Sequence, residues 1–110
     1  MNNKEEDVAE VMEDLAQAVA LTKAMLEAVK TGEWETVHKL SSQRMQYLER
    51  FFSHELSPEV AGDIEQVIRS IQALDKQITV YCDTEREQLL RELNGLKKQK
   101  AGTAAYQAHG

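Results

Sequence analysis

Apolar residues recur at intervals of three and four along most of the chain, which is the spacing of one face of an α-helix. The first such stripe is followed by Gly32, a residue that can take the left-handed conformation that ends helices. Acidic residues precede the stripe and Lys30 closes it, as the helix dipole favours. The pattern predicts a first helix over residues 5–31. Its apolar face consists of Val8, Val11, Met12, Leu15, Val19, Thr22, Leu26 and Val29.

A second stripe begins directly after Gly32 and predicts a helix over residues 33–54. A connection this short leaves two consecutive helices little choice but to fold back as an antiparallel hairpin. Two polar residues weaken the stripe without breaking it. Its members are Trp34, Val37, Ser41, Arg44 or Met45, Leu48 and Phe52.

Ser57 and Pro58 form a helix start signal, because a serine side chain can cap free amides and proline fits the first helical position. They predict a third helix over residues 57–97, followed by a short C-terminal helix or tail over 98–110. The stripe of this helix crosses a polar stretch at 83–88. It consists of Val60, Ile64, Val67, Ile71, Leu74, Ile78, Tyr81, Leu89, Leu93 and Leu96.

The three predicted helices differ in length, and this difference determines the expected architecture. A rise of about 1.5 Å per residue gives them roughly 40, 33 and 58 Å. We therefore expect an all-α, single-domain protein over residues 1–110, in which a helical hairpin packs on a long third helix as a three- to four-helix bundle. The first two helices are too short to bury the leucines at the end of the third, and exposed apolar patches usually mark contact sites.

The charge distribution narrows the range of partners. The net charge of −6 arises within residues 1–35, which hold nine acids and three lysines, whereas the remainder has ten of each sign. An acidic surface repels phosphate backbones, so we expect no nucleic-acid ligand. No apolar run is long enough to span a membrane and no signal sequence is present, so we expect a cytoplasmic protein with no membrane partner.

Catalytic and metal-binding patterns are missing from the sequence. His38, His54 and His109 lie on different segments, and none has a histidine or cysteine at helical metal-ligand spacing. Cys82 lies mid-helix beside Asp83 and Glu85, whose charges oppose thiolate formation. We therefore predict a protein that is not an enzyme and has no cofactor or metal site.

The end of the third stripe is the candidate binding surface. Leucine and isoleucine at this spacing usually form core, and we expect them to do so from Val60 to Ile78. Beyond Tyr81 the first two predicted helices are too short to cover the stripe, so either another protein or a second copy would cover this surface. The candidate partner-binding residues are Ile78, Tyr81, Leu89, Leu90, Leu93 and Leu96.

Two segments resemble the FliT-type flagellar export chaperones. Residues 25–37, reading MLEAVKTGEWETV, look like the junction between the first two helices of that family. The ending, with Gln99 and Lys100 followed six residues later by Tyr106, is similar to the family's C-terminus. The order and lengths of the predicted helices agree as well.

The resemblance implies a cytoplasmic type III export chaperone that holds the filament-cap protein and delivers it to the export gate and the export ATPase complex. In some relatives the same surface also restrains the flagellar master transcription regulator. It further implies that residues 98–110 cover the groove and that Tyr106 contacts the export gate. The alternative from the residues alone is a structural or regulatory helical homodimer without a secretion client.

Overall fold

The computed structural model describes the backbone of residues 3–109 and the side chains of residues 7–102. It contains α1 (Asn3–Lys30), α2 (Trp34–Ser53), the short 3₁₀ helix η1 (Pro58–Val60) and α3 (Ala61–His109). The predicted all-α class is confirmed. Residues 98–109, expected as a separate helix or tail, are instead the last turns of α3. The chain divides into two compact units, residues 1–79 and 80–110, with the boundary inside α3 rather than at a linker.

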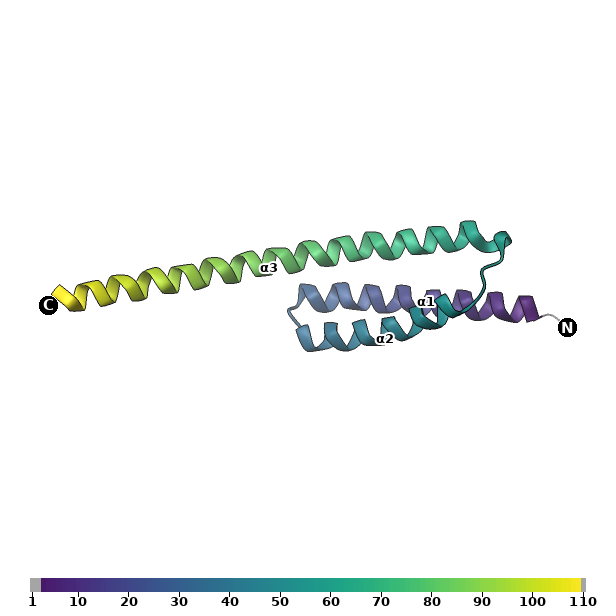
Figure 1. Ribbon diagram of the computed structural model, residues 1–110, viewed down its shortest axis with the longest axis horizontal. Helices are drawn as coiled ribbons and strands as arrows, with labels where there is room; N and C mark the ends of the chain where they lie inside the picture. The colour runs from purple at the N-terminus through teal and green to yellow at the C-terminus, as the bar shows by residue number, and fades with distance from the viewer. Residues whose placement is uncertain (1–2, 110) are drawn as a thin grey trace. The chain divides into compact units, whose positions relative to one another are not determined.

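A tight turn at Gly32 folds α2 back along α1 (Figure 1). The Glu33 amide donates to the Ala28 carbonyl at 2.9 Å, and the Gly32 amide donates to that of Val29 at 3.1 Å. These two bonds satisfy the last free carbonyls of α1 in the Schellman arrangement. Gly32 has a φ of 72°, a conformation that costs other residues energy, so the predicted role of this glycine is confirmed.

The face that α1 buries is the one predicted, whereas the stripe predicted for α2 is correct only in part. Its members Val37, Ser41, Arg44 and Leu48 are half-buried, but Trp34 is 42% and Phe52 72% exposed. Phe51, which the prediction left out, is 1% exposed. With the half-buried Leu40 and Tyr47, it completes a strict alternation of three and four residues, which again marks one helical face. This series is Val37, Leu40, Arg44, Tyr47 and Phe51.

The third helix starts later than the Ser57 signal indicates. Ser57 is extended and forms no side-chain cap, and its carbonyl accepts the Val60 amide at 3.2 Å in the 3₁₀ turn of η1. Within residues 1–79, the first turns of α3 then pack on the hairpin. A core cluster joins all three helices and comprises Val11 and Leu15 of α1, Phe51 of α2 and Ile64 of α3, with Met12, Val60, Val67 and Ile68 around it.

Arg44 links the same three helices through polar contacts. Its guanidinium donates to Asp75 of α3 at 2.6 Å and to the Thr22 hydroxyl of α1 at 3.2 Å. Thr22 is fully buried and donates its own proton to the Ala18 carbonyl at 2.7 Å. An arginine can therefore lie inside the apolar stripe of α2, because its charge is paired and its Nη1 group donates to two acceptors.

The second unit consists of the rest of α3. From Asp83 to Gly102 every described side chain is exposed. No other helix covers this stretch within the described part of residues 80–110. Its backbone hydrogen bonds are satisfied within the helix, so its exposed apolar residues are the feature that requires explanation.

The one-position difference in α2 is directly testable. Phe51→Ala removes a fully buried ring and should lower the free energy of unfolding by about 3–5 kcal/mol. Phe52→Ala removes an exposed ring whose main contact is edge-on with Phe51, the ring centroids being 5.0 Å apart, and should lower the free energy of unfolding by only about 0.5–1.5 kcal/mol. Urea denaturation of the two variants measures both values, and equal losses would contradict the assigned face.

The Arg44–Asp75 pair should contribute modestly to stability. A double-mutant cycle with Arg44→Ala and Asp75→Ala should give a coupling energy of about 1 kcal/mol. Buried hydrogen bonds to charged groups contribute more than this value, and fully exposed ion pairs contribute less. The Arg44 side chain is 17% exposed and that of Asp75 42%, which places the pair between these cases. A cycle on the exposed pair Glu65 and Arg69 serves as the control and should give a smaller coupling.

Candidate partner-binding surfaces

Four leucines of α3 form what we call the leucine surface: Leu89, Leu90, Leu93 and Leu96. Their exposed fractions range from 49% for Leu90 to 61% for Leu96. At about 100° per residue, three of them lie within roughly 60° of one another around the helix axis, and Leu90 flanks them. Large apolar side chains clustered on one exposed face are typical of protein-binding sites.

Charged residues at the two ends of the leucine surface differ in sign. Glu85 lies about one turn before Leu89, and Lys100 about one turn after Leu96. Both project near the leucine side of the helix, given the same angular spacing. A partner helix can therefore satisfy both ends if its own charges run in the complementary order.

The other predicted site residues lie in different environments. Tyr81 is exposed and lies about two turns before Leu89. Ile78 is 8% exposed and belongs to the packed part of residues 1–79, so it is not available on the surface as the leucines are. The side chain of Tyr106 lies outside the described residues.

A second exposed apolar stripe, which the sequence reasoning missed, runs along α2. Trp34, Met45 and Phe52 are all exposed, and their spacings of eleven and seven residues put them on one side of the helix. The sequence predicted that Trp34 and Phe52 face the core, with Met45 as the alternative to Arg44. The three-and-four series that ends at Phe51 was a signal for the buried face, but it differs from the predicted stripe by one position at Leu40, Tyr47 and Phe51, and the sequence pattern alone does not choose between them.

Catalytic groups are not assembled among the described side chains. Cys82 is partly buried and unbridged. Asp7, Glu10 and His54 bring their ligand atoms within 4.8 Å of one another, although His54 lies far from the acids in sequence. A search for ligand spacing along one helix cannot find such a group, because its members come from two elements.

The sequence matches a known protein family over most of its length, including the leucine surface. A family model for the flagellar protein FliT matches residues 12–108. The chain belongs to this family. The match covers both the helical hairpin and nearly all of α3, including the leucine surface. No curated protein and no solved structure matches the chain.

Membership of the FliT family agrees with the geometry of the chain. The family is one of flagellar chaperones rather than enzymes, and a chaperone needs an apolar surface that is accessible to another protein. None of the helices in the described part of the chain has a stretch apolar enough to cross a membrane. The exposed stripes on α2 and α3 are therefore candidates for protein contacts.

Proposed function

We propose that this protein is a cytoplasmic type III export chaperone that binds the filament-cap protein through the leucine surface of α3. The observation that carries the proposal is the exposure of four leucines on one face of a helix in a member of a chaperone family. Exposed leucines cost solubility, and a protein keeps them where a partner buries them. The client would supply an amphipathic helical segment whose apolar side covers these residues.

Delivery of the client to the export gate and the export ATPase complex is part of the same proposal. Tyr106, close to the end of the chain, is the residue we propose for the gate contact. The flagellar master transcription regulator would compete with the client for the leucine surface, because one face of one helix cannot serve two partners at once. Such competition would couple transcription to the supply of free client.

The fold does not support the expectation that residues 98–109 cover the leucine surface of the same molecule. These residues continue α3 as a helix, and a straight helix cannot fold onto its own side chains. The leucine surface would then be open to partners without a segment of its own chain to displace.

The alternative function is a helical homodimer without a client, and the charges at the ends of the leucine surface favour one arrangement for it. Antiparallel pairing about the midpoint between residues 92 and 93 puts Leu89 against Leu96 of the second copy. The same pairing puts Glu85 against Lys100, whereas parallel pairing puts each charge against its own kind. A two-fold axis repeats both contacts.

Leu89→Asp combined with Leu93→Asp should abolish capture of the filament-cap protein in a pull-down assay, because two charges would have to be buried in the interface. The far-ultraviolet helix signal should remain, since both side chains are exposed. Loss of the helix signal would mean that these leucines are core.

The matched control places the same two charges on the opposite side of the helix. Thr84→Asp combined with Gly95→Asp changes two exposed residues that lie about 100° or more around the helix axis from every leucine, and a side chain added at Gly95 meets only open space. This variant should capture the filament-cap protein as well as the original chain. If both double variants lose capture equally, added negative charge rather than the leucine surface is responsible, and the proposal fails.

Light scattering across protein concentration distinguishes the homodimer from the chaperone. In the homodimer, Lys100→Glu should raise the dimer dissociation constant by placing like charges together, and adding Glu85→Lys should restore it. A dimer that responds in this way and is insensitive to a filament-cap peptide would favour the alternative. A monomer, or a dimer that the peptide dissociates, would favour the chaperone.

A further inference from the structure

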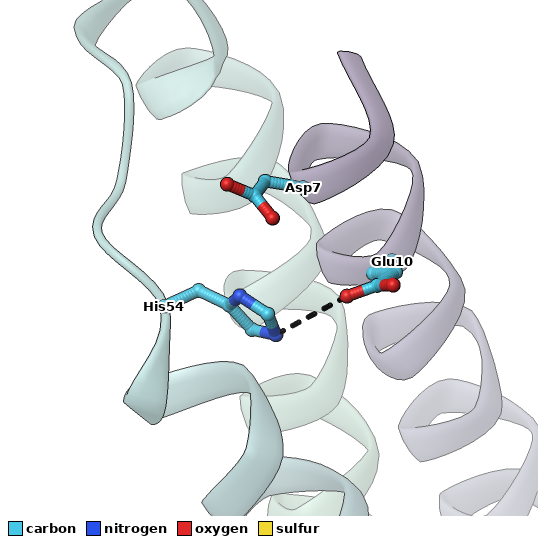
Figure 2. Close-up of side chains that lie close together, drawn as sticks. All are labelled: Asp7, Glu10 and His54. Atoms are coloured by element: carbon cyan, nitrogen blue, oxygen red, sulfur yellow. Dashed lines mark ion pairs between the residues drawn. The ribbon is translucent and has the colours of Figure 1, made fainter. Parts of the chain in front are cut away.

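A separate group of side chains lies at the start of α1, within residues 1–79. Asp7 and Glu10 are one turn apart on α1, and His54 follows the last residue of α2 (Figure 2). Both carboxylates point toward the imidazole ring. The ligand atoms of the three residues all lie within 4.8 Å of one another.

The distances leave space for an ion between these groups. Nε2 of His54 is 3.9 Å from Oε2 of Glu10, which is too long for a hydrogen bond. With bonds of about 2.0–2.2 Å, two ligand atoms of a tetrahedral site lie about 3.4 Å apart, so these two atoms need to approach by about half an ångström. Atoms at the upper limit of 4.8 Å need to approach by more than about 1 Å, and the Glu10 side chain, 67% exposed, is free to rotate.

The surroundings of the group favour a cation. Glu10 and His54 line a depression together with Glu13 and Asp14, and Arg50 also lines it. Asp7 lines a neighbouring cleft of about 620 Å³ that is open to solvent and also contains Glu55 and Glu59. The local charge is therefore negative, and an ion can enter from water.

We infer that Asp7, Glu10 and His54 form a binding site for a divalent transition-metal ion such as Zn²⁺. One imidazole nitrogen and two carboxylates are a donor set that Zn²⁺ accepts, with water at the fourth position. An imidazole ligand disfavours Mg²⁺ and Ca²⁺, which prefer oxygen alone. The bound ion ties the first turns of α1 to the end of α2, where the chain leaves the hairpin for η1.

Calorimetric titration of the full chain with Zn²⁺ tests this site. The original chain should bind Zn²⁺ with the three residues as ligands, and its thermal unfolding midpoint should rise with Zn²⁺ but not with Mg²⁺. His54→Gln and, separately, Glu10→Gln should each weaken Zn²⁺ binding at least about tenfold. Loss of a residue that only hydrogen-bonds to a metal ligand often lowers metal affinity by this factor, and loss of a ligand should lower it at least as much. The Glu10 variant changes an exposed side chain and keeps the test valid if His54→Gln fails to fold.

Three matched variants control for other zinc ligands. His38→Gln removes a histidine within α2, Glu49→Gln removes an exposed carboxylate outside the group, and Cys82→Ser removes the thiol. Zn²⁺ affinity should be unchanged in all three, and the nuclear magnetic resonance signals of the His54 ring should shift on addition of Zn²⁺. Absence of Zn²⁺ binding, equal binding by His54→Gln, or loss of binding in Cys82→Ser would overturn the proposal.

Discussion

The arrangement within residues 1–79 depends on the hydrogen bonds of the Arg44 guanidinium. It bonds to Asp75 and to Thr22, so a single side chain of α2 connects α3 and α1. Apolar packing alone gives a helix some freedom to rotate, because neighbouring faces of α2 both carry large apolar residues. A charge inside the packed layer removes that freedom, since only one rotation of α2 brings Arg44 to its acceptors. Phe51 enters the core in that rotation, and Phe52 is left in solvent.

The exposed residues follow from the same constraint. Because α2 faces inward through Phe51, its outer side carries Trp34, Met45 and Phe52. The leucine surface of α3 has a different origin, since it belongs to the second unit, in which every described side chain of residues 83–102 is exposed. The chain belongs to a family of flagellar chaperones, and we propose that a client covers these unburied apolar side chains.

Much of the fold was accessible from the sequence, and the exceptions are informative. Gly32 predicted the hairpin turn, and the apolar stripe of α1 predicted its buried face. The rotation of α2 was not accessible, because the predicted stripe left Arg44 and Met45 as alternatives, and the pairing of Arg44 with Asp75 of a distant helix decides between them. The leucine surface was found from helix lengths, while the group around His54 was not, since its members meet only after the hairpin has closed.

The sequence by itself determined the helices, the turn between the first two, and the membership of a chaperone family, because these depend on local spacing and on short motifs. It also indicated that the leucines of α3 would lack a cover. The tertiary structure alone decided which side of α2 is buried and which polar groups lie together. Those features depend on contacts between residues far apart in the chain, and no local pattern encodes the partner that makes a buried charge acceptable.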